Sequence, residues 1–303
     1  MKLDNFYWLM YKGVNPNSKL SELEAFLLKF IYPIANWSIK QIIKQEKTRS
    51  LIESLQKTVP DISEQETHYT YKGVIEEKER AVQAFQCQFL LEIMSKASFQ
   101  DKEIFTLVDI GDSSGTHCLY FSELLKDKVK KIETISVNLD PKAIEKIKSR
   151  GLKAILCRAE DLDLGSKSTD LFTSFQMLEH LHDPVMFLRR LAKKSKGNYL
   201  FVTVPYFEKS RVGLHRIRNN LKEPVSAEET HIFELSPEDW NLLFIHSGWK
   251  PIFSKKHYHY PRNLPVVSLF LKYFWRILDF EGYWGIFLEK DLEISNYYQD
   301  WDE

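Results

Sequence analysis

Two glycines, four residues apart, follow the first strongly apolar strand pattern of the sequence. Gly111 and Gly115 stand in LVDIGDSSGTH, directly after a run that carries Asp109. Glycine at the first position allows a tight turn, and glycine before the next helix lets that helix pack close to the strand. A carboxylate beside such a turn is typical of a site for a nucleotide-like ligand, although an ordinary β–α turn uses the same residues.

Polar residues also follow the next two predicted strands. The second strand ends at Asn138, with Leu139 after it, and the third is followed by Ala159, Glu160 and Asp161. In open parallel sheets, ligands bind at the carboxyl ends of the strands. We expect the Asn138 amide to face ribose hydroxyls, since it can both donate and accept hydrogen bonds, and the two acids to face an adenine edge.

The fourth predicted strand ends in Phe175 and Gln176, which we expect above the same crevice. Imidazole titrates near neutral pH, so a histidine is the usual base for an oxygen nucleophile. The available histidines are His180, His182, His215 and His231, of which His180, His215 and His231 are the candidate bases. A histidine that only holds a loop by hydrogen bonding explains each of them as well. No spacing of acids and histidines indicates a metal site, so no metal is predicted.

These positions belong to alternating strand and helix patterns that begin near residue 104. The predicted strands are 105–110, 131–138, 153–157, 171–174 and 198–205, and helices are predicted at 116–126, 141–150, 184–194 and 236–248. Two further strands around an insertion complete the sheet. The alternation predicts an α/β fold, a Rossmann-like, mostly parallel seven-stranded sheet with helices on both faces.

The first 95 residues form a helical extension or cap in this prediction. Ser18 or Ser21 begins one helix with a capping box, a second runs from Trp37 toward Leu55, and a third covers 76–94. Residues 96–303 form the Rossmann-like domain, with insertions at about 207–230 and 262–280. We expect the extension to help form an acceptor pocket.

Taken in order, these pieces resemble the class I S-adenosylmethionine-dependent methyltransferases of the small-molecule type. The resemblance covers roughly residues 105–206 and 231–261: VDIGDSSG, VNLDP, RAEDL, FTSFQMLEHLHDP with LFVTVP, and HIFELSPEDWNLLFIHSGW. It implies S-adenosylmethionine as the cofactor. The implied cofactor contacts are Asp109, Gly111, Asp112, Ser113, Gly115, Asn138, Leu139, Ala159, Glu160, Asp161, Phe175, Gln176 and Tyr71.

Two positions depart from the family pattern. Ser113 replaces the middle glycine, and Asn138 replaces an acid that binds ribose. A small hydroxymethyl group still lets the backbone approach the ligand, and an amide still forms hydrogen bonds, so a working but atypical cofactor turn is predicted. NAD fits less well, because the GxGxxG pattern is absent.

The resemblance implies in-line methyl transfer, which we expect to methylate an oxygen of a small molecule or glycan-type metabolite. Arg211, Arg216 and Arg218 form a basic stretch that suits an anionic acceptor, or simply a solvated helix. The alternatives are a non-catalytic module that acts by binding a partner, motivated by the two departures, and a methyltransferase acting on protein or RNA.

Composition limits the partners and the compartment. Lys and Arg total 42, as do Asp and Glu, so the formal net charge is zero and a nucleic-acid partner is not expected. Three widely spaced cysteines and no signal peptide predict a cytoplasmic protein. The apolar helix expected at 266–278 suits membrane contact, whereas core packing or a homodimer contact is the commoner use of such a pattern.

Overall fold

The computed structural model describes residues 9–10, 13, 19–65, 72–97, 99, 102–165, 167–220, 222, 224–227, 230–278 and 280–298. The helices are α2 Glu22–Gln45, α3 Arg49–Thr58, α4 Val74–Lys96, α5 Thr116–Leu125, α6 Pro141–Ser149, α7 Pro184–Lys194, α8 His215–Arg218, α9 Pro237–His246 and α10 Pro265–Leu278. The strands are β1 Phe105–Ile110, β2 Ile132–Asn138, β3 Lys153–Leu156, β4 Leu171–Phe175, β5 Tyr199–Pro205, β6 Arg211–Val212, β7 Phe233–Glu234, β8 Trp249–Tyr258 and β9 Gly282–Lys290. Short 3₁₀ turns are η2 Ile62–Gln65, η4 Ala159–Asp161, η5 Leu178–His180 and η7 Ser295–Tyr297.

Seven strands form one sheet in the order β3-β2-β1-β4-β5-β9-β8. The first five run parallel, while β9 pairs antiparallel with both β5 and β8. The strands β6 and β7 form a separate two-stranded hairpin. The structure therefore confirms the predicted Rossmann-like, mostly parallel seven-stranded sheet.

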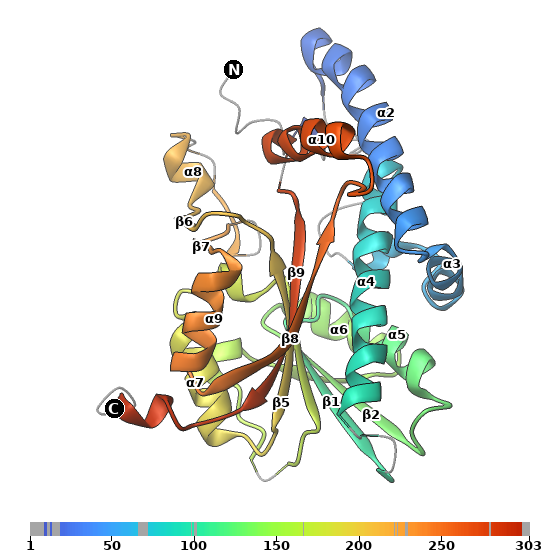
Figure 1. Ribbon diagram of the computed structural model, residues 1–303. Coiled ribbons are helices and arrows are strands. Elements are labelled where there is room, and N and C mark those ends of the chain that lie inside the picture. The colour runs from blue at the N-terminus through green and yellow to red at the C-terminus, as the bar shows by residue number, and fades with distance from the viewer. Residues whose placement is uncertain are drawn as a thin grey trace.

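Helices cover both faces of this sheet (Figure 1). Because side chains alternate along a strand, neighbouring residues of β1 enter different cores: Leu107 lies with α4 and α5, and Val108 lies with α7 and α9. The first core also contains the inner faces of α2, α3 and α10. The division of the chain at residue 95 stays a prediction, and this core extends across it.

The N-terminal helices differ in one respect from the prediction. Ser21 caps α2 with the expected capping box, because its hydroxyl accepts from the Glu24 amide and the Glu24 carboxylate accepts from the Ser21 amide. The helix then continues through Pro33 and Trp37 to Gln45, so the two predicted helices are one. The break comes at Lys47, whose φ of 57° lies in the left-handed region and ends the helix.

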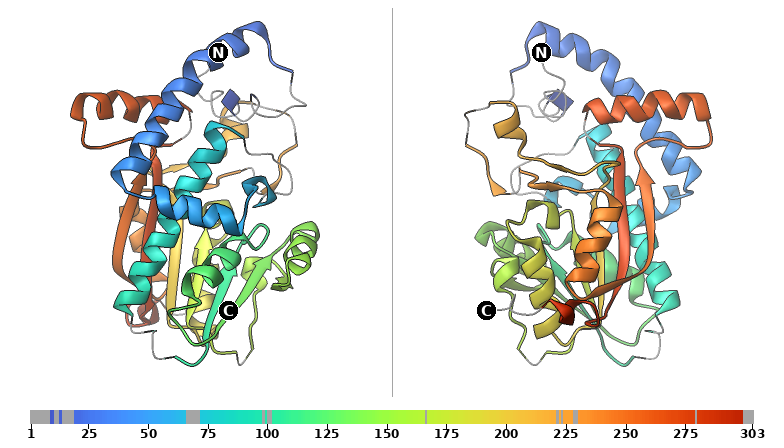
Figure 2. Two further views of the ribbon diagram at one scale, coloured as in Figure 1. Left: turned by 90° about the vertical axis from the view of Figure 1, so that its right-hand side faces the viewer. Right: turned by 60° about the vertical axis from the view of Figure 1, so that its left-hand side comes forward.

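The carboxyl ends of the parallel strands lie at the end of the molecule where α2 and α10 pack together (Figure 2). The register pairs Pro205, at the end of β5, with Tyr283, at the start of β9 directly after α10. The indole of Trp275 donates to Ser38, and the backbone of Arg262 donates to the Gln45 side chain, so α10 and the preceding loop are fixed to α2. The insertion predicted at 262–280 is therefore a helix at the ligand-binding end of the sheet.

Candidate functional site

The turn between β1 and α5 has the open backbone that its sequence predicts. Gly111 and Gly115 have φ angles of 89° and 81°, where side chains are strained. A Cβ at Gly111 would come within 2.7 Å of Met177, and one at Gly115 within 2.5 Å of Leu152. Gly111 is exposed and Ser113 is half-buried, so a ligand can approach the main chain of the turn closely.

Asn138 joins this turn to the end of the second strand. Its amide nitrogen donates to the carbonyl oxygen of Asp112 at 2.9 Å, and its amide oxygen accepts from the Asp140 backbone at 2.7 Å. An aspartate could not make the first of these bonds. The amide at this position thus holds two ligand-facing loops together.

The Asp112 side chain also stabilises the turn rather than facing the crevice. It accepts hydrogen bonds from the Gly115 backbone and from the Ser136 hydroxyl of β2. Burial first, and then the charge of Asp109, raises the pKa of Asp112 to about 6. We conclude that Asp112 shapes the cofactor turn from within.

An open rim surrounds the turn. Leu139 is 48% exposed, Asp161 is exposed, and Ala159 and Glu160 are half-buried in η4 after β3. Because β3 pairs with β2 and β2 with β1, these residues flank the glycine turn. These residues fit S-adenosylmethionine. The glycine backbone of the turn permits close approach, Leu139 offers an apolar surface to the flat adenine base, and Glu160 and Asp161 can accept hydrogen bonds from amino groups.

Phe175 ends β4, and Gln176 follows it. The Phe175 ring is buried among His117, Phe121 and Phe201, on the side of the sheet that α4 and α5 cover. Gln176 has a φ of 48°, and its side chain donates to the Thr203 hydroxyl of β5 at 2.6 Å. Both side chains therefore have contacts within the protein, and their place beside the cofactor stays a prediction.

Buried polar side chains of α4, α5 and the sheet form a connected series of contacts near the cofactor turn. His117 lies with Nδ1 3.5 Å from an Asp109 carboxylate oxygen and Nε2 3.0 Å from the Gln86 side-chain oxygen. The Gln86 amide in turn donates to Thr203 at 3.1 Å, and Thr173 donates to Asp109 at 2.7 Å. Burial alone would lower the pKa of His117, but the Asp109 carboxylate outweighs it, and this pKa lies above its ordinary value. These contacts link α4 to the ends of three strands.

Two of the three candidate bases lie together after β4. His180 and His231 have ring centroids 4.8 Å apart, and both lie beside the Glu179 carboxylate. Burial, and then the charge of His231, lowers the pKa of His180 to about 3. Burial likewise raises the pKa of Glu179 to about 7. The ligand atoms of the three side chains lie within 4.8 Å of one another, a geometry that can hold a metal ion or the polar end of an acceptor.

His215 does not join this cluster, because it lies in the short helix α8, where Nδ1 faces the Asn219 amide at 3.1 Å. The predicted basic stretch stabilises the hairpin: Arg211 pairs with Glu234, and Arg218 donates to the carbonyl oxygens of Val212 and Gly213. Tyr71 lies outside the described residues.

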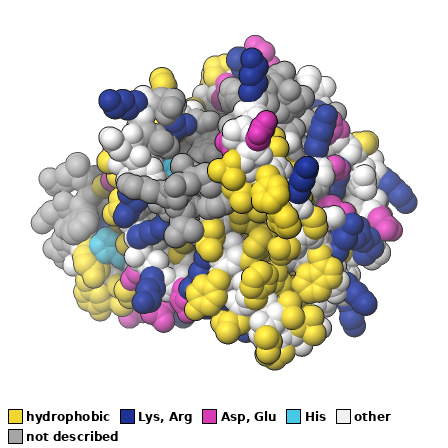
Figure 3. Space-filling model, turned by 90° about the horizontal axis from the view of Figure 1, so that it is seen from above, with side chains coloured by type: hydrophobic (Ala, Val, Ile, Leu, Met, Phe, Trp, Pro, Cys, Tyr) yellow, Lys and Arg dark blue, Asp and Glu magenta, His cyan; other side chains and the backbone are white. Residues whose placement is uncertain are grey.

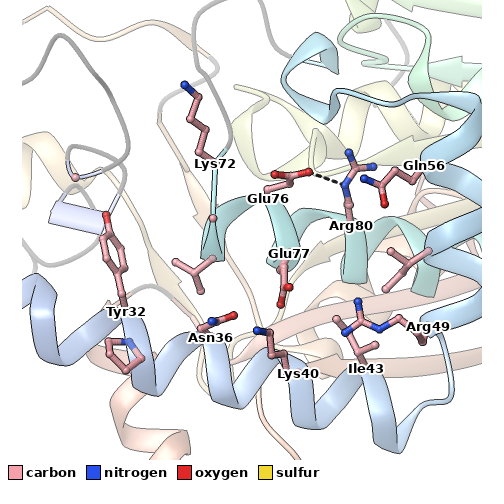
Figure 4. A pocket seen from close by; sticks show the side chains of 15 residues that line it. Tyr32, Asn36, Lys40, Ile43, Arg49, Gln56, Lys72, Glu76, Glu77 and Arg80 are labelled. Carbon is pink, nitrogen blue, oxygen red and sulfur yellow. Dashed lines mark hydrogen bonds and ion pairs between the residues drawn. The ribbon is translucent and has the colours of Figure 1, made fainter.

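A cavity of about 860 Å³ lies between α2, α3 and the start of α4, with Tyr32, Lys40, Arg49, Lys72 and Glu77 among its lining residues (Figure 4). None of the predicted cofactor residues that the structure describes lines it. The guanidinium of Arg80 at its edge donates to Glu76 and to the Pro60 carbonyl.

Sequence reasoning did not select Gln86, His117, Thr203 or Glu179 as site residues. Gln86 offered a signal, since it stands among the apolar residues Phe85, Cys87 and Phe89 in the buried part of α4. A polar side chain at such a position needs a buried partner. The partners themselves lie 31 and 117 residues away, so only the folded chain reveals them.

Comparison with known proteins places the same region in one family. A family model described as "Methyltransferase domain" matches residues 108–202. Two Mycobacterium tuberculosis proteins (strains CDC 1551 / Oshkosh and ATCC 25618 / H37Rv), each named "Probable S-adenosylmethionine-dependent methyltransferase", are 26% identical over 133 residues, 43% of this chain. The chain matches 45% of the length of these relatives.

A solved geranyl diphosphate methyltransferase in complex with S-adenosylmethionine shares the fold. Its TM-score is 0.51 at 13% identity, over 71% of this chain and 88% of that one. At this identity the likeness concerns the fold alone. Among the helices that the structure describes, none combines the length and the apolar character needed to cross a bilayer.

Proposed function

We propose that this chain, which belongs to the class I S-adenosylmethionine-dependent methyltransferase family, methylates an oxygen atom of a small molecule or glycan-type metabolite. S-adenosylmethionine is the cofactor of the family. The observation that carries the proposal is the glycine turn at 111–115, open toward the crevice and held against β2 by the Asn138 amide.

The cofactor supplies a methyl group on a sulfonium whose thioether leaves readily, so the protein mainly has to align the reactants. In this proposal the turn at 111–115 binds the cofactor, and the rim of Leu139, Glu160 and Asp161 orients its adenosine. A member of the cluster of Glu179, His180 and His231 accepts the proton of the acceptor hydroxyl as the hydroxyl oxygen attacks the methyl group. The cluster is favoured over His215 because it follows β4 directly and combines a carboxylate with two imidazoles.

The N-terminal helices form part of the acceptor pocket in this proposal. A contact between α4 and the sheet supports this role, since the Gln86 amide donates to Thr203 of β5. The cavity between α2, α3 and α4 is lined by none of the described residues assigned here to the cofactor or to catalysis, so the role does not depend on it. The balanced charge of the chain favours such an acceptor over nucleic acid. A cytoplasmic location remains part of the proposal, since Cys87, Cys118 and Cys157 form no disulfide.

Calorimetric titration with S-adenosylmethionine, S-adenosylhomocysteine and NADH tests cofactor binding. We expect micromolar binding of the two sulfur compounds and no binding of NADH. Ser113→Trp should weaken that binding at least about tenfold, because an indole fills the open turn. Ser149→Trp, at the exposed end of α6, is the matched control and should bind normally.

Two outcomes of the titration decide between this proposal and its alternatives. If neither sulfur compound binds, the non-catalytic alternative replaces this proposal. If both bind, methyl transfer from labelled cofactor to a panel of hydroxylated metabolites and glycans identifies the acceptor, and transfer only to protein or RNA would reject the small-molecule assignment.

A further inference from the structure

A buried carboxylate lies between two histidines after β4. Glu179 is 1% exposed, and neither of its carboxylate oxygens has a hydrogen-bond partner among the described residues. Leaving such a group buried without compensation is costly, so it calls for a positively charged ligand or a proton. Nε2 of His180 lies 4.0 Å from one of the carboxylate oxygens.

The hydrogen bonds of His180 direct one ring nitrogen toward this carboxylate. Its Nδ1 lies 3.1 Å from the carbonyl oxygens of both Ala227 and Thr230. Carbonyl oxygens only accept, so Nδ1 carries the hydrogen and Nε2 carries the lone pair. A histidine whose second nitrogen is bound to a backbone carbonyl is the usual arrangement of a metal ligand.

His231 has the other common arrangement. Its Nδ1 lies 3.4 Å from a carboxylate oxygen of Glu234, which also pairs with Arg211. A carboxylate behind a histidine fixes the ring and raises the basicity of its other nitrogen. The hairpin of β6 and β7 thus positions His231 against the residues that follow β4, and the Ile232 amide donates to the Glu179 carbonyl.

We propose that Glu179, His180 and His231 bind a divalent transition-metal ion, contrary to the sequence expectation of no metal. Two imidazoles and one carboxylate suit such an ion and leave coordination positions open. Ligand atoms at about 2.1 Å from a metal lie roughly 3.4 Å apart, so the present spacing, within 4.8 Å, closes with small side-chain rotations. The role of the ion rests on the proposed function: it would bind the acceptor oxygen and lower the pKa of the acceptor hydroxyl.

Calorimetry of the full-length protein, dialysed against a chelator and titrated separately with Zn²⁺ and Mn²⁺, tests the site without cofactor or acceptor. We expect one ion per chain with micromolar or tighter affinity. Glu179→Gln and His231→Ala should each weaken binding at least about tenfold. His182→Ala, an exposed histidine two residues from His180, is the control and should bind like the wild type.

Circular dichroism of each variant verifies its fold before titration. Absence of binding by the wild type, or equal affinity in both ligand variants, overturns the metal site. The S-adenosylmethionine titration is independent: binding of cofactor without metal rejects only the metal, and binding of metal without cofactor rejects only the methyltransferase proposal.

A second inference concerns the outer faces of α2 and α10. Apolar side chains of both helices gather on one face of the molecule (Figure 3). The exposed apolar residues of this face are Leu23, Phe26, Phe30, Trp37, Leu264, Val266, Val267, Leu269, Phe270, Tyr273 and Ile277, with Val266 84% exposed. An apolar patch of this kind marks an interaction surface. Opposite residues such as Leu271 and Trp275 are buried, so each helix has two apolar sides.

Bases outnumber acids along the two helices, whose acids are Glu22 and Glu24 in the first turn of α2. Between residues 25 and 45 and between 262 and 278 the chain has no acid, and its bases there are Lys29, Lys40, Lys44, Arg262, Lys272 and Arg276. Lys272 and Arg276 contact Glu208, and Lys40 lines the cavity between α2, α3 and α4. The bases that remain are Lys29, Lys44 and Arg262. Such a surplus is distinctive in a chain with zero net charge.

We propose that this face docks on an anionic lipid bilayer, with both helices lying in the interface. Apolar side chains enter the acyl boundary, and the bases contact lipid phosphates, as in other interfacial helices. Because α10 leads into β9 beside the carboxyl end of β5, docking brings the ligand-binding end of the sheet close to the bilayer.

Flotation with phosphatidylcholine vesicles, with and without 30% phosphatidylglycerol, tests the docking face. We expect binding to the anionic vesicles, at least about tenfold weaker binding to neutral ones, and a comparable loss in Phe26→Ser/Phe270→Ser. Leu242→Ser, which removes a 65% exposed side chain from α9, is the control and should bind normally.

Absence of flotation with anionic vesicles overturns the proposal. So does sedimentation showing a dimer that Phe26→Ser/Phe270→Ser dissociates, since a second copy would then cover this face.

Discussion

Replacing Asn138 by aspartate, the acid typical of this position, is expected to weaken S-adenosylmethionine binding rather than restore it. The Asn138 amide nitrogen donates to the Asp112 carbonyl, and the side chain is only 7% exposed. A carboxylate would place an acceptor against that carbonyl, near the buried Asp112 carboxylate. We expect a loss of about 2 kcal/mol, roughly 30-fold in affinity, as the turn at 111–115 loosens.

Calorimetric titration of Asn138→Asp with S-adenosylmethionine measures this loss, and chemical denaturation should show a destabilisation of the same order. Asp140→Asn is the matched control, since asparagine also caps α6 and accepts from the Lys142 amide. Tighter cofactor binding by Asn138→Asp would mean that the side chain contacts ribose directly and does not serve as the bridge between the loops.

Replacing Gln86 by leucine is expected to cost about 3 kcal/mol of folding stability, because the substitution leaves the buried Nε2 of His117 without its partner. Gln86 is fully buried on α4, accepts from His117, and donates to Thr203. Leucine is close in volume, so the loss comes from the hydrogen bonds of the Gln86 side chain to His117 and Thr203. The melting temperature should fall by roughly 5 °C.

Thermal and chemical denaturation measure this effect. Gln88→Leu is the matched control, because Gln88 lies on the exposed side of the same helix and should change stability little. If Gln86→Leu were as stable as the wild type, the polar contacts from α4 to β5 would not hold the N-terminal helices to the strand ends. Weaker cofactor binding in Gln86→Leu would show that these contacts also position Asp109.

The amino-acid sequence alone determined the elements of the α/β region and the place of the cofactor turn. The alternation of apolar residues predicts β1 at the residues where the structure has it, and Pro184 with the last-turn lysines predicts α7 equally well. These signals are local, because the period of a strand or helix and the caps at its ends are set by neighbouring residues. The glycines at 111 and 115 likewise predict the open backbone conformation that the structure has at these positions.

Only the tertiary structure decided where the polar side chains point. Phe175 and Gln176 come at the predicted end of β4 but contact the core, and Asp112 and Asn138 bind each other's loops. The meeting of Glu179 with His231 depends on a hairpin about 50 residues further along the chain, and that of His117 with Gln86 on a helix outside the alternating region. Contacts of such long range depend on packing geometry, which no local sequence pattern encodes.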